Sequence, residues 1–196
     1  MTDDAATGDG RAVIATDRLI LRDWTESDLA PFAEMNACPQ VCEFLSRTLS
    51  KEQSDTFVRN IADHFRGNGY GLYALEVKAS GTFIGFTGLS VPSFAAHFMP
   101  TVEIGWRLAR AYWGQGYATE AAKAVIAHGF DRLGLREIVS FTVPANMRSR
   151  AVMEKIGLRR DGRDDFDHPK LPEGHRLRRH VLYRLQRSWR TNEAVS

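Results

Sequence analysis

A pair of glycines separated by one residue marks the part of the chain whose residue types could bind a ligand. Gly114-Gln115-Gly116 follows a strand-like run at residues 101–108 and leads into an alanine-rich helical segment that opens with Tyr117, Ala118 and Thr119. Glycine lacks a Cβ atom, so its backbone can turn sharply and approach a ligand closely. The first N–H groups of a helix carry partial positive charge and favour phosphate groups. The spacing therefore predicts a strand–turn–helix unit that holds a pyrophosphate.

Two familiar phosphate-binding turns fit these glycines poorly. A P-loop requires Lys-Ser or Lys-Thr directly after its last glycine, and neither pair follows Gly116. A dinucleotide-binding fingerprint requires a third glycine at position 119, where this chain has Thr119. A plain tight turn between a strand and a helix would also explain the two glycines taken alone.

A third reading rests on resemblance to a known family. YWGQGYATEA, residues 112–121, resembles the element with which GNAT acetyltransferases cradle the pyrophosphate of coenzyme A. Downstream, Asn146-x-x-Ser149 followed by Glu154-Lys155-x-Gly157-Leu158 resembles the second GNAT signature. The opening TDRLILRDWTESDL resembles the RimJ/RimL-like branch, the ribosomal-protein N-terminal acetyltransferases and their relatives. The resemblance extends from Thr16 to Gln186, and two signatures in the right order make it specific.

The resemblance implies an α/β fold with a mixed, mostly antiparallel sheet of about seven strands flanked by about four helices. It also implies acetyl-CoA as co-substrate, with its pantetheine arm in a V-shaped gap between the strands at 101–108 and 137–143. The pyrophosphate would lie on backbone N–H groups from Gly114 to Thr119. Asn146 resembles the family asparagine that hydrogen-bonds the coenzyme arm, and an N-cap would explain it as well. The backbone groups expected to face the arm belong to Ile104, Trp106 and Leu108.

The family reaction transfers acetyl directly to an amine, which must first lose its proton. Glu103 is the candidate base, because a lone carboxylate in an apolar strand has a raised pKa. Its alternative role is to order the strand or to pair with an arginine. Many family members place a tyrosine seven residues after the asparagine to protonate the leaving thiolate, but this chain has Met153 there. Ser149 resembles the serine proposed to act instead in the RimJ/RimL-like branch, or it simply faces a helix groove.

The acceptor is predicted to be a protein or peptide N-terminal α-amine. Such amines have a pKa near 7.7–8.0, so they need less help than lysine, whose pKa is near 10.4. Acceptor contacts are predicted at Phe44, between the first two helices, and at His168, in a loop near the C-terminus; both also have ordinary structural explanations. A small-molecule amine such as an amino acid, polyamine or aminoglycoside is the alternative substrate. A non-catalytic acyl-CoA-binding module would carry the same glycines and asparagine.

Local patterns predict the elements that position these residues. Residues 18–22 indicate a strand, and Thr25 or Ser27 could cap the helix that follows. Ser50-Lys51-Glu52-Gln53 is a capping box for a second helix that ends at Gly69. Strands at 70–77 and 82–89 form a hairpin, and 91–100 is an aromatic loop on the substrate side. A helix from 116 to about 133 buries Ala121, Ala122, Val125, Ile126 and Phe130.

Composition bounds the class of protein. The chain has 196 residues, predicted as a disordered tail at 1–12, one domain at 13–190 and a flexible end at 191–196. A net charge of +2 argues against a nucleic-acid partner, and no apolar run is long enough for a membrane partner. Without a signal peptide, the cytoplasm is the expected location, as a monomer or homodimer. Cys38 and Cys42 are expected to be buried free thiols, and no motif indicates a metal.

Overall fold

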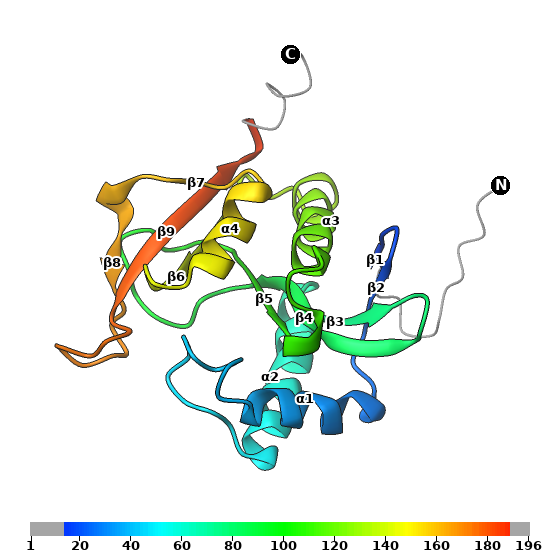
Figure 1. Ribbon diagram of the computed structural model, residues 1–196. Helices are drawn as coiled ribbons and strands as arrows, with labels where there is room; N and C mark the ends of the chain where they lie inside the picture. The colour runs from blue at the N-terminus through cyan, green and yellow to red at the C-terminus, as the bar shows by residue number, and fades with distance from the viewer. Residues whose placement is uncertain (1–13, 189–196) are drawn as a thin grey trace.

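A mixed sheet runs through the centre of the fold in residues 14–188, the part that the computed structural model describes (Figure 1). Its order is β1-β2-β3-β4-β5-β6-β9-β7, with β8 paired to β9. Only β5 and β6 pair in parallel among the strands described. The bounds are β1 (Ile14–Ala15), β2 (Leu19–Arg22), β3 (Leu72–Val77), β4 (Thr82–Ser90), β5 (Glu103–Leu108), β6 (Glu137–Thr142), β7 (Arg159–Arg160), β8 (Phe166–Asp167) and β9 (Arg179–Gln186).

The mixed, mostly antiparallel sheet and its α/β class are confirmed, but residues 14–188 contain nine strands rather than about seven. The difference comes from β1 and β7, which have two residues each and are too short to produce an alternating pattern in the sequence. The predicted end segments 1–12 and 191–196 lie outside the described residues, so the predicted domain boundaries stay predictions.

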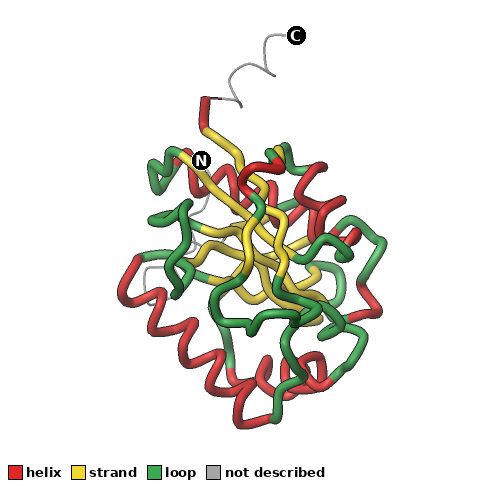
Figure 2. Tube along the Cα trace, turned by 90° about the vertical axis from the view of Figure 1, so that its left-hand side faces the viewer, coloured by secondary structure: helices red, strands yellow, loops and turns green. Residues whose placement is uncertain are grey.

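Four α-helices cover the two faces of the sheet in the described part of the chain. They are α1 (Leu29–Ala37), α2 (Lys51–Asn68), α3 (Tyr117–Asp131) and α4 (Met147–Lys155), with short 3-10 helices η1 (Glu26–Asp28), η2 (Arg110–Tyr112) and η3 (Gly162–Asp164). Helices α3 and α4 lie on one side of the sheet, and α1 and α2 lie on the other (Figures 1 and 2). The loop 38–50 between α1 and α2 reaches α4, because Glu43 of the loop pairs with Arg148 of that helix at 2.7 Å.

The helix ends follow the predicted capping patterns, with one correction. The side chain of Ser50 accepts a hydrogen bond from the Gln53 N–H at 3.3 Å, and Gly69 ends α2 in a left-handed conformation with φ 76°. Thr25, in contrast, precedes η1, so α1 begins at Leu29 with Asp28 as its N-cap. The one-turn η1 helix was not visible in the sequence pattern.

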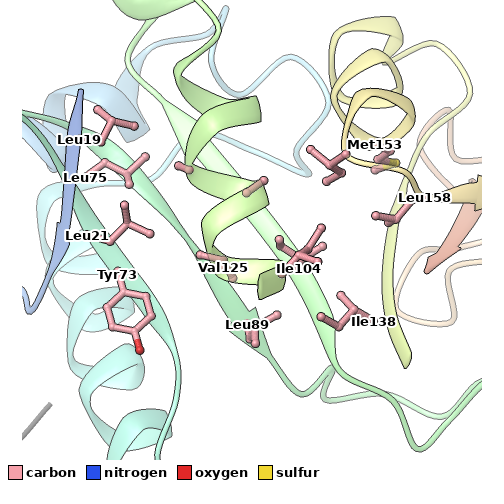
Figure 3. Close-up of a cluster of buried hydrophobic side chains, with 14 of the residues drawn as sticks. Leu19, Leu21, Tyr73, Leu75, Leu89, Ile104, Val125, Ile138, Met153 and Leu158 are labelled. Atoms are coloured by element: carbon pink, nitrogen blue, oxygen red, sulfur yellow. The ribbon is translucent and has the colours of Figure 1, made fainter. Parts of the chain in front are cut away.

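The main hydrophobic core lies between α3 and the sheet (Figure 3). All five residues of the predicted stripe on α3 are buried: Ala121, Ala122, Val125, Ile126 and Phe130. The two alanines let the helix approach the strands closely, and Ile104, Leu108 and Ile138 meet it from β5 and β6. The core therefore anchors α3 directly over the strands that border the predicted site.

The loop 91–100 packs against the C-terminal half of the sheet. Phe98 is buried in a cluster with Val139, Phe166 and Leu182, and Phe94 packs on the same cluster. Its predicted place on the substrate side is not seen, because none of its residues lines the main cavity of the described chain. The aromatic pattern that suggested substrate contact reflects this second, smaller core.

Candidate active site

Strands β5 and β6 separate soon after they meet. They share one paired position, Glu103 with Val139, and the Val139 N–H donates to the Val102 carbonyl at 2.9 Å. Beyond this point each strand pairs only with its outer neighbour, β4 or β9, within the described residues. The predicted gap between the two strands is therefore present, and Glu103 lies at its closed end.

Backbone alternation shows which main-chain groups of β5 face the gap. Successive residues of a strand direct their N–H and C=O groups to opposite edges. The Val102 carbonyl faces β6, whereas the Ala109 N–H faces β4 and bonds the Ile84 carbonyl at 2.9 Å. The main-chain groups of Ile104, Trp106 and Leu108 therefore face the gap, as predicted. The Leu108 carbonyl already accepts a hydrogen bond from the Trp113 indole at 2.8 Å. The backbone N–H and C=O groups of Trp106 are therefore the main ones available to a ligand in the gap.

A cavity of about 670 Å³ opens along this gap and extends over both faces of β5. Most of the predicted site residues line it: Phe44, Glu103, Trp106, Leu108, Gly114, Gly116, Tyr117, Ala118, Thr119, Asn146, Ser149 and His168. Ile104 does not, because its side chain is fully buried in the core. Gln115 does not either; its side-chain amide donates to the Ala111 carbonyl at 2.9 Å. Side chains from between Val41 and His180 thus meet around one volume.

The glycine turn has the backbone geometry that only glycine adopts without strain. Gly114 and Gly116 have φ values of 74° and 84°, and a Cβ added to Gly114 would meet nothing within 4 Å. The first intrahelical bond of α3 runs from the Glu120 N–H to the Gly116 carbonyl at 3.0 Å. The N–H groups of residues 117–119 therefore have no acceptor within the helix. A helix start with open space before it fits a phosphate group.

Arg18 holds this turn from the start of β2, and no short sequence pattern indicated it. Its Nε donates to the Glu120 carboxylate at 2.7 Å, and its Nη1 donates to the Gln115 carbonyl at 3.0 Å. Its guanidinium also lies 4.5 Å from the centre of the Tyr117 ring. One arginine thus connects the glycine turn, the first turn of α3 and the N-terminal strands.

Glu103 is the one carboxylate among the residues that line the cavity. Burial raises the pKa of its carboxyl from 4.5 to about 8, while the cavity leaves part of the side chain accessible to water. No charged neighbour contributes to this pKa, and no arginine pairs with Glu103 in the described residues. The alternative role as an ion-pair partner is therefore not supported.

Asn146 caps α4 and connects it to β6. Its side-chain oxygen accepts the Ser149 N–H at 3.2 Å, and its amide donates to the Thr142 hydroxyl at 3.0 Å. The N-cap interpretation is confirmed, and the side chain lines the cavity as well. Ser149 borders the same cavity, and only its backbone N–H takes part in the cap. Met153, one turn on, is buried and packs in the core.

Two walls enclose the rest of the cavity. Phe44 belongs to one wall, where the Arg148 guanidinium lies 5.8 Å from its ring centre and pairs with Glu43 at 2.7 Å. His168 and His180 belong to the other, with ring centres 5.2 Å apart. Burial lowers the pKa of both histidines, so both are neutral near pH 7. His180 and Arg148 were not among the predicted site residues, because no local spacing connects them with the other residues of the site.

Arg107 is another cavity residue that sequence reasoning missed. It follows Trp106 on β5, and its side chain reaches the opposite face of the sheet, where it donates a hydrogen bond to Asn36 of α1.

In the described residues, no group of three or more His, Cys, Asp or Glu side chains could hold a metal ion. Over the same residues, no helix is long and apolar enough to cross a membrane.

The comparisons with known proteins agree with this geometry. Residues 18–159 match the family model described as "Acetyltransferase (GNAT) domain". The uncharacterized protein YkkB of Bacillus subtilis is 34% identical over 146 residues, covering 74% of this chain and 84% of that protein. The chain belongs to the GNAT acetyltransferase family. Enzymes of this family use acetyl-CoA, so the amine acceptor is the open question.

Solved structures show the same GNAT fold. An acetyltransferase of Bacillus anthracis superimposes with a TM-score of 0.74 at 26% identity, covering 89% of this chain and 98% of that one. The ribosomal L7/L12 α-N-protein acetyltransferase RimL, solved with coenzyme A, gives a TM-score of 0.71 at 19% identity, with 89% and 98% covered. At that identity the likeness to RimL extends to the fold alone.

Proposed function

We propose that this GNAT enzyme acetylates the N-terminal α-amine of a protein or peptide, as its RimJ/RimL-like sequence features suggest. One observation carries the proposal: a carboxyl group with a pKa near 8 lies at the closed end of the β5–β6 gap. That pKa is close to the pKa of an α-amine, 7.7–8.0, whereas the pKa of a lysine side chain is more than two units higher. A base of this strength is suited to remove the proton of an α-amine near neutral pH.

Acetyl-CoA would occupy the gap in this proposal. The N–H groups of residues 117–119 and the turn at Gly114 and Gly116 would hold the pyrophosphate, supported by the open space at Gly114. The main-chain groups of Trp106 would pair with the pantetheine arm. Asn146 would contact the arm from its capping position at the start of α4.

Glu103 and Ser149 would handle the two protons of the reaction. Glu103, directly or through a water, takes the proton of the ammonium group, and the neutral nitrogen then bonds the thioester carbon. As the carbon–sulfur bond breaks, the electron pair leaves with sulfur, and the nitrogen loses its second proton, which passes to the thiolate directly or through water to give the free thiol. The Ser149 hydroxyl donates a hydrogen bond to that sulfur; a thiol with a pKa near 8.5 needs no stronger acid.

The direct test is acetyl-CoA turnover with matched acceptors. Release of free thiol would be measured with a peptide that has a free α-amine, with the same peptide blocked at its N-terminus but carrying a lysine, and with free amino acids and polyamines. We expect the free-amine peptide to give the highest kcat/KM. Turnover only with a small amine would replace the proposed acceptor, and acetyl-CoA binding without any turnover would indicate a binding module.

A further inference from the structure

One face of β5 places a carboxyl group and a guanidinium group on either side of an open position. Residues 103, 105 and 107 alternate onto the face that α1 and α2 cover, since Arg107 contacts Asn36 of α1. A Cβ added to Gly105, between Glu103 and Arg107, would meet nothing within 4 Å. The space above Gly105 is therefore open, with the Glu103 carboxyl on one side of it and the Arg107 guanidinium on the other.

Arg107 is held firmly but lacks a counter-charge. Its Nη1 donates to the Asn36 side-chain oxygen, and Asn36 is itself fixed by donating to the Ser54 hydroxyl at 2.8 Å. The guanidinium lies 5.6 and 5.5 Å from the ring centres of Phe57 and Phe86. No carboxylate pairs with Arg107 among residues 14–188.

The charge of Arg107 persists at neutral pH. Burial lowers the pKa of its guanidinium to about 10, which still leaves the group protonated. Cys42 is the one ionisable neighbour that acts on it, and burial raises the pKa of that thiol, so the thiol is neutral. A cation that is largely removed from water and has no counter-charge is costly. Most of its five N–H donors also remain available to a ligand.

The whole cavity lining shows the same imbalance of charge. Its cations are Arg107, Arg148 and Lys155, and Glu103 is its one carboxylate, mostly protonated near pH 7. Arg148 and Lys155 belong to α4, beside the gap that the coenzyme phosphates would approach. Arg107 lies on the other face of β5, against α1 and α2, so coenzyme binding does not account for it.

We infer that the acceptor carries a carboxylate that pairs with Arg107, and specifically that it is an N-terminus with an acidic residue at its second or third position. This inference rests on the proposed function, with the amine near Gly105 and Glu103. Gly105 lies about 7 Å along the strand from Arg107, and one or two residues of extended peptide span a similar length. Arginine binds carboxylates in a bidentate geometry, which makes it selective for charge and position.

Two peptides that differ only in charge test the inference. Acetylation of Ala-Glu- and Ala-Gln- peptides of equal length would be compared for the wild type, Arg107→Lys, Arg107→Met and the control Arg148→Met. We expect the wild type to favour the Glu peptide at least tenfold in kcat/KM. The preference should fall to near one in Arg107→Met, remain in part in Arg107→Lys and persist in Arg148→Met.

Several outcomes would overturn the inference. Equal kcat/KM values for the two peptides in the wild type would do so, as would an undiminished preference in Arg107→Met. A structural role of Arg107, through Asn36, would lower both values equally and leave their ratio unchanged. Stabilisation of each variant by acetyl-CoA checks that it is folded; if Arg107→Met is not, the Lys variant and the wild-type ratio decide.

The proposed function can fail separately. If neither peptide is acetylated but small amines are, the proposal of a protein or peptide acceptor is wrong. An amino acid and its amide, which differ only in the carboxylate, then replace the two peptides in the comparison of kcat/KM. If nothing is turned over, equilibrium dialysis of the two peptides against the protein saturated with coenzyme A gives the same ratio as a binding preference. Equal binding of the charged and neutral members would overturn the carboxylate inference.

Discussion

In the proposed mechanism, the side chain of Glu103 serves catalysis at the expense of stability. Its carboxyl lies at the point where β5 and β6 separate, without a cation beside it in the described residues, and burial alone raises its pKa to about 8. An ion pair would stabilise the strand but would keep the carboxylate a weak base. The absence of such a pair is therefore consistent with a residue that exchanges protons with an amine.

Replacing Glu103 with glutamine should reveal the loss of folding stability that the buried carboxyl causes. Below pH 4.5 the carboxyl is protonated in both the folded and the unfolded state. Between pH 4.5 and 8 the unfolded state loses the proton and the folded state keeps it, so the wild type loses stability as pH rises. Glu103→Gln removes this loss and should be more stable by up to about 4 kcal/mol at pH 8, with little difference near pH 4.5.

Urea unfolding of both proteins at several pH values checks this prediction, and the acetylation rate is measured in parallel. The variant should lose most of its kcat, and its remaining pH dependence should follow the amine alone. A stability difference that does not change with pH would contradict the raised pKa.

Ser149 allows a clean test of the thiolate's hydrogen-bond donor. The Ser149 backbone N–H, not its hydroxyl, bonds Asn146, so Ser149→Ala keeps the cap of α4. The loss of one hydrogen bond to the departing sulfur should lower kcat about tenfold, or ~1.4 kcal/mol, with the KM for acetyl-CoA nearly unchanged. Steady-state kinetics decide the matter, and an unchanged kcat would remove Ser149 from the mechanism.

At the scale of elements, the strand–turn–helix unit from β5 to α3 is the most local part of the site. Two left-handed glycines, a helix start and an alanine-rich stripe all come from consecutive residues. Their positions depend on packing, however, because Arg18 ties the turn to β2 through Gln115 and Glu120. Neighbouring residues therefore determine the conformation of this unit, and the distant Arg18 side chain fixes its position against β2.

Gly114→Ala and Gly134→Ala form a matched pair for this unit. Both glycines have left-handed backbones, with φ 74° and 68°, and neither has an atom within 4 Å of an added Cβ. Each alanine should therefore cost a similar 1–2 kcal/mol of stability. Only Gly114 lines the cavity, so only Gly114→Ala should also raise the acetyl-CoA dissociation constant, by about tenfold or more. Calorimetric binding compares them; equal affinities would mean that the turn does not bind the coenzyme.

At the scale of the molecule, the cavity is a product of the whole chain. Its lining comes from the loop after α1, from β5 and β6, from the starts of α3 and α4, and from the C-terminal loop and β9. These segments are held together by one sheet whose central pair separates at Glu103 and Val139. A ligand that fills the gap would connect both halves of the sheet and stabilise the entire fold.

Acetyl-CoA should therefore raise the thermal unfolding temperature. A ligand at one hundred times its dissociation constant adds about 2.7 kcal/mol, which is a shift of several degrees for a domain of this size. Scans with acetyl-CoA, NAD and ATP at equal concentration provide the measurement. A shift with NAD and none with acetyl-CoA would contradict the proposed use of the Gly114–Gly116 turn.

The sequence by itself determined the features that depend on neighbouring residues. The capping box at Ser50, the left-handed Gly69, the buried stripe of α3 and the glycine turn all follow from patterns within a few residues. It also indicated the GNAT fold through two signatures, and the cavity lining includes most residues predicted from them. Errors arose where an element was too short to show a period, as in η1, β1 and β7.

Only the tertiary structure decided which distant side chains meet. Arg18 and Gln115 lie 97 residues apart, and Asn36 and Arg107 lie 71 apart, so no local spacing connects them. The alternation of β5 could be guessed, but which face carries α1 and α2 depends on how the whole sheet is covered. The charge of the cavity could therefore not be predicted from the sequence, because the electrostatic environment depends on distance in space rather than along the chain.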